Sequence, residues 1–258
     1  MQTSKNVKKS LTQNRIPRIS TRGFYDLTSG RTLKKKPYAV YPKRFFNDLG
    51  KFHELTIMIH GLRNNKQGAL AKFTMAQKRL KQLGYKYPVI GFSYDSNTKG
   101  VQYKSTEAKA TNVGRTIARK NGYNLAQFVL DLKKQHPDTK IRLIGHSLGT
   151  EVILSTIHRL KKKNLVESVY LFGSSIPADS FSVRKFGRVA QNVVREKICN
   201  YYSTHDEVLK YGFESGIIQK PLGYSGTQGK TIPKYVQKHV HPKNHRFASY
   251  AAVLRSFP

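Results

Sequence analysis

Ser147 lies between two glycines in the segment Gly145-His146-Ser147-Leu148-Gly149. A serine can attack an acyl carbonyl when a sharp turn exposes its hydroxyl and a nearby base takes the proton. Such a turn strains the serine backbone and brings the flanking segments close together, so the residues two positions away must lack side chains. Gly145 and Gly149 meet this requirement. The pattern therefore predicts a nucleophile elbow with Ser147 as the nucleophile.

The segments on either side of Ser147 have the periodicities that such a turn connects. Before it, Ile141, Leu143 and Ile144 form a short apolar run, which is typical of a strand buried within a sheet. After it, apolar residues recur at helical spacing at Val152, Ile153, Ile157 and Leu160. The Leu148 amide should then lie at a helix N-terminus, where it can donate a hydrogen bond to an oxyanion.

A second oxyanion donor is expected after an earlier strand. Residues 55–59 are strand-like and run into His60-Gly61-Leu62. A glycine at this point lets the loop turn in close to the elbow. The Leu62 amide can then donate a hydrogen bond beside that of Leu148.

A carboxylate follows another predicted strand, at residues 198–202. Active sites of open parallel sheets lie beyond the carboxyl ends of the strands. Asp206 is therefore the expected acid that orients the base, and Glu207 is the alternative.

Three histidines near the end of the chain are candidates for the general base: His239, His241 and His245. We expect His245 to be the base, because it opens a run with helical spacing whose apolar side chains can hold the ring in place. His239 and His241 precede Pro242 in an extended segment or loop. The spacing of the three also resembles a metal-ligand pattern, but no cysteine or convincing carboxylate joins them. We therefore expect no metal and no cofactor.

The predicted fold class is α/β. Apolar runs of strand length occur at residues 55–59, 88–94, 141–144, 169–172 and 198–202, and segments with helical spacing separate them. This alternation predicts a mostly parallel central sheet of about five to seven strands with helices on both faces.

The segment before the elbow strand is expected to be broken into parts. Residues 95–111 are polar and should form an irregular rim of the pocket. The following helix should begin near Val113, be interrupted at Asn121-Gly122 and stop at Pro137.

Residues 1–50 are expected to form a basic N-terminal arm, partly disordered or packed on the domain, and residues 51–258 the α/β domain. Part of residues 31–41 could add an edge strand. No apolar run is long enough to span a bilayer, and the N-terminus lacks the apolar core of a signal peptide. A cytoplasmic location is therefore expected.

The chain is strongly basic. Its 258 residues include 47 Lys and Arg against 14 Asp and Glu, a formal charge of +33, of which residues 1–50 carry +10. The excess is therefore spread over the folded part as well. A field of this size attracts polyanions such as nucleic acid or an anionic membrane surface. The alternative explanation is a proteome-wide basic bias or a high-salt habitat.

Five segments resemble those of a group of mostly uncharacterised, lipase-like α/β-hydrolases known chiefly from archaeal and bacterial genomes. They are residues 59–65, 91–98, 145–149, 202–209 and 244–250, and the resemblance covers about residues 54–255. It implies the α/β-hydrolase fold, with Ser147 as nucleophile, Asp206 as acid and His245 as base. Arg246 is an extra residue between that histidine and the phenylalanine that follows it in the relatives.

Two functions follow as hypotheses. The first is a serine hydrolase acting on carboxylic esters, esterase-like or lipase-like. No long apolar insertion offers a lid, and residues 174–196 could form only a modest cap, which favours short-chain or soluble esters over bulk lipid. The second is a basic polyanion-binding protein on the same scaffold, associated with nucleic acid or packed in a virion, with weak or no catalysis. Nothing in the sequence indicates an oligomeric state.

Overall fold

The five apolar runs form five strands in the computed structural model, which describes residues 16–258. These strands are β3 (Glu54–Ile59), β4 (Val89–Ser93), β5 (Lys140–His146), β6 (Val166–Phe172) and β7 (Val194–Tyr202). The first four are buried along all or nearly all of their length, and β7 along its second half. Strands covered on both faces have no solvent-facing side, so each contains a run of mainly apolar residues without regular polar alternation.

Three more strands complete the sheet: β1 (Arg18–Ser20), β2 (Ala39–Tyr41) and β8 (Tyr235–His239). The order is β2-β1-β4-β3-β5-β6-β7-β8. Every junction is parallel except the one between β1 and β2. The predicted mostly parallel α/β architecture is therefore confirmed. The eight strands exceed the five to seven expected, because the added strands are short or mostly exposed and contain no apolar run.

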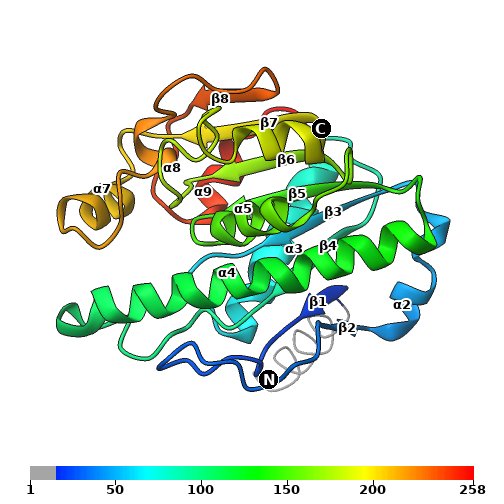
Figure 1. Ribbon diagram of the computed structural model, residues 1–258, viewed down its shortest axis with the longest axis horizontal. Coiled ribbons are helices and arrows are strands. Elements are labelled where there is room, and N and C mark those ends of the chain that lie inside the picture. The colour runs from blue at the N-terminus through cyan, green and yellow to red at the C-terminus, as the bar shows by residue number, and fades with distance from the viewer. Residues whose placement is uncertain (1–15) are drawn as a thin grey trace, which may run out of the picture.

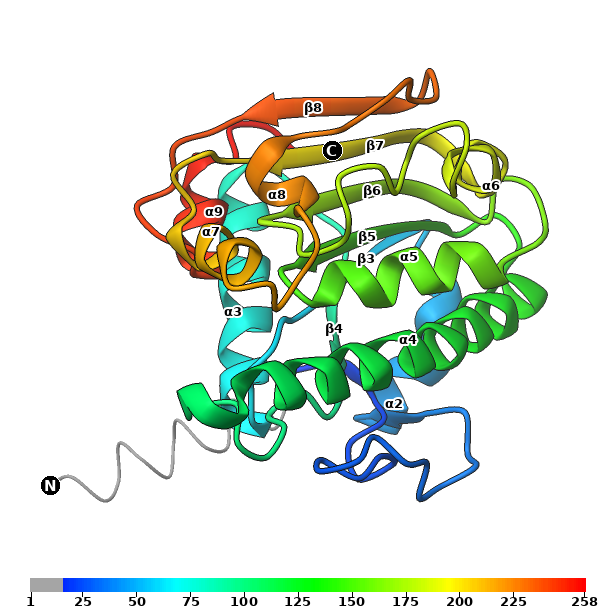
Figure 2. The same cartoon turned by 60° about the vertical axis from the view of Figure 1, so that its left-hand side comes forward.

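Helices cover both faces of the sheet (Figures 1 and 2). One face carries α3 (Lys66–Gln82) and α9 (Phe247–Val253). The other carries α4 (Lys104–Gln135), α5 (Gly149–Arg159) and α6 (Gly187–Val193). The connections contain α2 (Lys43–Asn47), the short 3₁₀ helix η1 (Leu49–Lys51), α7 (Glu207–Glu214) and α8 (Leu222–Ser225).

Helix α4 corrects the prediction for residues 95–137. It begins at Lys104 and runs without a break to Gln135, so part of the expected irregular rim is helical. Asn121 and Gly122 do not interrupt it. The side-chain amide of Asn121 (Nδ2) donates to the carbonyl oxygen of Ile117, one turn earlier. A Cβ atom at Gly122 would lie 2.3 Å from the Ser155 hydroxyl of α5, so this glycine permits the close approach of the two helices.

The described part of the N-terminal segment, residues 16–50, is built into the sheet. The edge strand expected within residues 31–41 is confirmed by β2. Two tyrosines fasten the segment to α4: Tyr25 donates to Asn124 Oδ1, and Tyr38 donates to Asp131 Oδ2, both at 2.6 Å. Residues 1–15, the expected disordered start of the arm, lie outside the described residues.

Among residues 16–258, the helices are too short or too polar to cross a bilayer.

Candidate active site

Ser147 stands on a sharp turn between β5 and α5. Its φ angle of 53° lies in the left-handed region, which a residue with a side chain seldom adopts. The flanking positions must be glycine because there is no room for a side chain at either. A Cβ atom at Gly145 would lie 2.7 Å from Ile153 Cδ1, and one at Gly149 would lie 2.4 Å from the Ile59 carbonyl oxygen. The turn therefore has the geometry that the five-residue pattern predicts.

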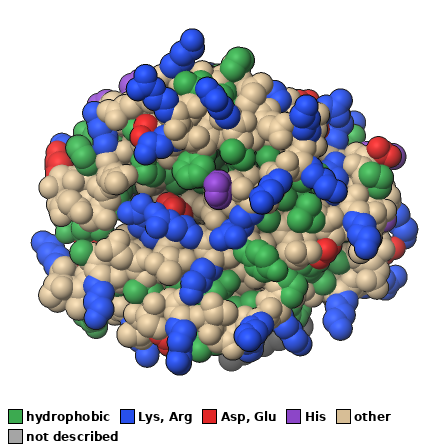
Figure 3. Space-filling view, viewed as in Figure 1, with side chains coloured by type: hydrophobic (Ala, Val, Ile, Leu, Met, Phe, Trp, Pro, Cys, Tyr) green, Lys and Arg blue, Asp and Glu red, His purple; other side chains and the backbone are tan. Residues whose placement is uncertain are grey.

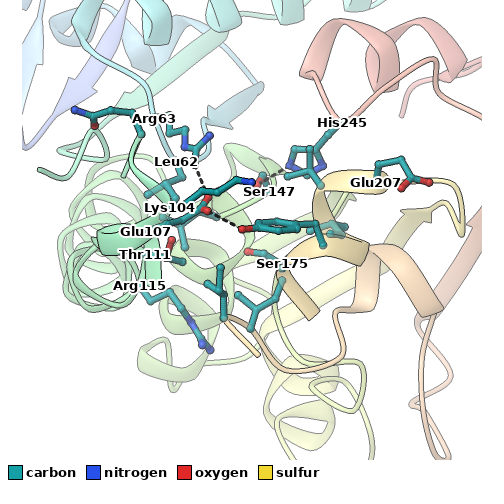
Figure 4. A pocket seen from close by; sticks show the side chains of 18 residues that line it. Leu62, Arg63, Lys104, Glu107, Thr111, Arg115, Ser147, Ser175, Glu207 and His245 are labelled. Atoms are coloured by element: carbon teal, nitrogen blue, oxygen red, sulfur yellow. Dashed lines mark hydrogen bonds and ion pairs between the residues drawn. The ribbon is translucent and has the colours of Figure 1, made fainter. Parts of the chain in front are cut away.

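Asp206, His245 and Ser147 form a continuous chain of hydrogen bonds, of which Figure 4 draws the link between His245 and Ser147. His245 Nδ1 lies 2.7 Å from Asp206 Oδ2, and His245 Nε2 lies 2.9 Å from Ser147 Oγ. A carboxylate accepts the Nδ1 proton, which leaves Nε2 as the acceptor of the serine hydroxyl proton. Asp206 follows β7 and His245 precedes α9, so the three residues come from the carboxyl edge of the sheet.

The Asp206 carboxylate is completely buried and held by three donors. Besides His245, Tyr250 OH donates to Oδ2 at 2.7 Å, and the Leu209 amide donates to Oδ1 at 3.2 Å. Burial by itself would raise the pKa of Asp206, but these hydrogen bonds and the charge of protonated His245 bring the pKa below its ordinary value. Asp206 is therefore ionised at neutral pH.

Tyr250 is a residue of the site that the sequence reasoning assigned only to packing. Its ring is fully buried. It also lies against Gly173, where a Cβ atom would come 2.9 Å from the ring. The only sequence signal was its position on the helix that starts after His245.

Two further histidines, both buried, hold the loops of the site. His146 Nε2 lies 2.7 Å from the His245 carbonyl oxygen, and this contact ties the turn at Ser147 to the segment that carries His245. His60 Nδ1 lies 3.0 Å from the Gly61 carbonyl oxygen. Burial lowers the pKa of each ring to about 3. Both are therefore neutral donors near pH 7, and neither adds positive charge beside His245.

The backbone amides of Leu62 and Leu148 remain free for a ligand. Neither has a hydrogen-bond partner among residues 16–258. Both residues line the same cleft as Ser147 and His245. Gly61 packs against the serine, since a Cβ atom there would lie 2.9 Å from Ser147 Cβ. Two unpaired amide donors beside the Ser147 hydroxyl could bind a negatively charged oxygen.

The cleft has a volume of about 490 Å³ and two walls. One wall is the first part of α4, within residues 95–111, where the rim of the pocket was expected. The other is α7 with the residues after it, which the sequence did not indicate. Glu107 of α4 connects them, because it pairs with Arg63 and accepts a hydrogen bond from Tyr211 of α7 at 3.3 Å. The apolar lining comes mainly from Leu62, Leu148, Val208, Leu209, Ile217 and Ile218.

The expected cap, residues 174–196, contributes only Ser175 to the lining of this cleft. The Ser175 hydroxyl is buried and has no hydrogen-bond partner among the described residues. Figure 4 shows Ser175 beside the cleft, on the opposite side from Arg63.

The other candidate residues lie apart from the hydrogen-bonded chain. Glu207 is exposed at the start of α7, and within the described part of the chain His245 Nδ1 bonds to Asp206 instead. His239 and His241 are exposed and do not reach Ser147; they lie beside His205.

The chain is similar to one family of unknown function and to several solved structures. The family described as "Protein of unknown function (DUF726)" matches residues 102–228. No curated protein matches the chain. One similar solved structure is a lipase-esterase related protein from Clostridium acetobutylicum, with 14% identity, a TM-score of 0.41 and coverage of 78% of this chain and 90% of that chain. A second is an α/β serine hydrolase without lid from Xanthomonas campestris, with 15% identity, a TM-score of 0.43 and coverage of 79% of this chain and 78% of that chain. A third is a cold-adapted esterase from an Arctic intertidal metagenomic library, with 15% identity, a TM-score of 0.40 and coverage of 74% of each chain.

Proposed function

We propose that this chain, which has the α/β-hydrolase fold, is a serine hydrolase acting on carboxylic esters, esterase-like or lipase-like. The observation that carries the proposal is the chain of hydrogen bonds from Asp206 through His245 to the Ser147 hydroxyl. A serine within hydrogen-bond distance of a histidine, itself oriented by a buried carboxylate, is the arrangement that activates serine for acyl transfer.

In the proposed first half-reaction, Ser147 Oγ attacks the carbonyl carbon of the ester. His245 Nε2 takes the hydroxyl proton and then gives it to the leaving alcohol, so an acyl-enzyme and a free alcohol result. Asp206 keeps the Nδ1 proton in place and stabilises the imidazolium that forms between these transfers. Its ionisation at neutral pH supports this role.

In the second half-reaction, water replaces the alcohol. His245 takes a proton from the water, the hydroxyl attacks the acyl carbon, and the proton returns to Ser147 as the acid leaves. In both halves the negative charge on the carbonyl oxygen would be bound by the Leu62 and Leu148 amides, whose lack of other partners supports this assignment.

The apolar lining of the cleft suits the acyl or alcohol part of an ester better than a charged group. Arg63, Lys104 and Arg115 lie at its edge, but Arg63 pairs with Glu107 and Arg115 lies 3.9 Å from Glu151. An ester small enough for a cleft of this volume therefore fits the site, and the proposal favours short-chain or soluble esters over bulk lipid.

The alternative, a polyanion-binding protein, would require basic side chains gathered on one surface. On the face shown in Figure 3, Lys and Arg are spread over the whole surface and do not form one patch. We therefore base the proposal on the hydrogen-bonded site and not on the charge.

Labelling with a fluorophosphonate probe tests the proposal without knowledge of the natural substrate. Such a probe forms a covalent bond only with an activated serine. We expect stoichiometric labelling of the wild type and of His53→Ala, a control at an exposed histidine just before the amino end of β3, at the opposite end of the parallel strands from Ser147. Ser147→Ala should not be labelled. Equal labelling of wild type and Ser147→Ala, or none of the wild type, would contradict the proposal.

A further inference from the structure

The structure regroups the histidines near the end of the chain. The spacing along the sequence places His239 and His241 with His245, but the fold separates His245 and adds His205 to the other two. Strands β7 and β8 are parallel neighbours, and Tyr202 pairs with His239. His205 follows Tyr202 by three residues, and His241 follows His239 by two. The three rings therefore meet at the carboxyl ends of adjacent strands, where loops of a parallel sheet commonly carry binding sites.

The nitrogen atoms of these rings converge on one small volume. One ligand nitrogen from each ring lies within 4.8 Å of the other two. Thr204 Oγ1 lies 3.5 Å from His205 Nδ1 and 3.3 Å from His239 Nε2, so both nitrogens face the same hydroxyl. The centroid of the His241 ring lies 4.8 Å from that of His239 and 5.8 Å from that of His205.

We propose that His205, His239 and His241 form a binding site for a transition-metal cation, with Zn²⁺ as the expected ion. Neutral imidazole is a ligand for zinc and its neighbours in the transition series, whereas calcium and magnesium require oxygen atoms. Three histidines with a fourth position open to water are a complete ligand set for tetrahedral zinc.

The observed separations are compatible with binding after a small movement. Zinc bonds to histidine nitrogen at about 2.0 to 2.1 Å, so nitrogens in a tetrahedral site lie about 3.3 Å apart. Nitrogens separated by 4.8 Å or less must approach by about 1.5 Å at most. The three side chains are exposed, and rotation about their side-chain bonds can supply this movement.

Metal bound here would join the two loops that carry the proposed acid and base. His205 immediately precedes Asp206, and His241 lies four residues before His245. The site shares no residue with the hydrogen-bonded chain at Ser147. It therefore acts as a clamp that restrains both loops, and it binds metal whether or not the proposed hydrolase activity is present.

Calorimetric titration of chelator-treated, full-length protein with ZnCl₂ tests the site. We expect one saturable zinc site per chain and an increase in melting temperature on binding, because the ion binds the folded state. His205→Ala and His241→Ala should each weaken binding by more than about a hundredfold, since a residue that merely orients a ligand already costs about 10 to 100-fold. His53→Ala, an exposed histidine far along the chain from this site, is the matched control and should bind zinc as the wild type does.

Cobalt provides a second measurement. Tetrahedral Co²⁺ absorbs visible light, so the wild type should develop this absorption and both ligand variants should lack it. Circular dichroism of the metal-free variants verifies that they are folded. Unchanged zinc affinity in His205→Ala or His241→Ala would overturn the proposal. So would the absence of saturable binding in the wild type up to about 1 mM Zn²⁺.

Discussion

Two groups of three histidines lie at the same edge of the sheet and differ in what holds them. In the inner group, His60, His146 and His245, each ring has a fixed hydrogen-bond partner on the loops around Ser147. In the outer group, the rings of His205, His239 and His241 are exposed. They contact one another and Thr204, and His239 also stacks on the Tyr202 ring.

The difference shows that burial and partners, more than position along the chain, decide what a histidine can do. A ring with one N–H held by a carboxylate or carbonyl oxygen has one defined tautomer, which a general base or a positioning residue requires. An exposed ring keeps a nitrogen lone pair available for a cation. The following predictions test this contrast, beginning with the largest expected effect.

Removal of the inner base or of the serine should abolish activity. We expect Ser147→Ala and His245→Ala each to lower turnover of an activated ester by about 10⁶-fold, because members of a triad act as a unit. Asp206→Asn should cost about 10⁴-fold, since the amide favours the wrong tautomer of the ring. Steady-state kinetics of the purified variants measure these effects. An active His245→Ala beside an inactive His241→Ala would assign the base to the outer group.

The two buried inner rings should make stability depend on pH. In the folded state His60 and His146 have a pKa of about 3, whereas in the unfolded chain each has the ordinary pKa of about 6.5. The unfolded state therefore binds more protons below pH 6.5, and stability present above that pH is lost as the pH falls toward 3.

When the pH is lowered from 7.5 to 5.5, each of these two rings should lower the free energy of unfolding by about 1.4 kcal/mol. Urea unfolding at the two pH values measures the sum. Resonances of the His60 and His146 rings that shift between pH 7.5 and 5.5 in the folded protein would contradict the assignment.

Loss of the Tyr250 hydroxyl should have a smaller effect on turnover than the changes at Ser147, His245 and Asp206. Tyr250→Phe keeps the buried ring but removes a hydrogen bond to a buried carboxylate, which costs about 1.5 to 3 kcal/mol. We expect turnover to fall by about tenfold. Asp206 should also become easier to protonate, so the variant should lose activity at a higher pH than the wild type as the pH is lowered. A pH–rate profile identical to that of the wild type would mean that Tyr250 only fills space.

The smallest effect on turnover should come from the outer group. His239→Ala and His241→Ala, assayed without metal, should each lower ester turnover by less than about tenfold, the lower limit for loss of a residue that only supports a site. Neither ring contacts Ser147 or Asp206 among the described residues. A loss of turnover as large as that of His245→Ala would contradict the distinction between the two groups.

The parts of the fold that could be predicted from the sequence are those determined by residues within a single segment. Strands β3 to β6 and the second half of β7 are buried on both faces, and each contains a run of mainly apolar residues by which it could be recognised alone. Strand β8 has one buried residue in five and gives no such signal. The predicted break at Asn121-Gly122 was wrong. Gly122 lies in an unbroken helix and permits close packing against Ser155 of α5, and local helix propensity cannot reveal that tertiary partner.

The candidate site also has one part that local sequence could predict and another that it could not. The elbow is a local pattern, and the order of serine, acid and histidine narrows the choice of partners. The cleft walls bring together Glu107, Tyr211 and Arg63 from distant segments, and the outer histidines depend on the register between β7 and β8. Neither arrangement can be predicted without the fold.

The two outermost strands carry a consequence for self-association. An exposed strand edge offers unpaired amides and carbonyls to any other chain, which leads to aggregation. Here β2 has three residues and is followed at once by Pro42, and β8 lies between Pro233 and Pro242 and includes Lys238. Proline cannot donate to a new strand, and lysines of like charge repel a second copy. Both edges of the sheet are therefore poorly suited to recruit another molecule of this protein, even when it is crowded.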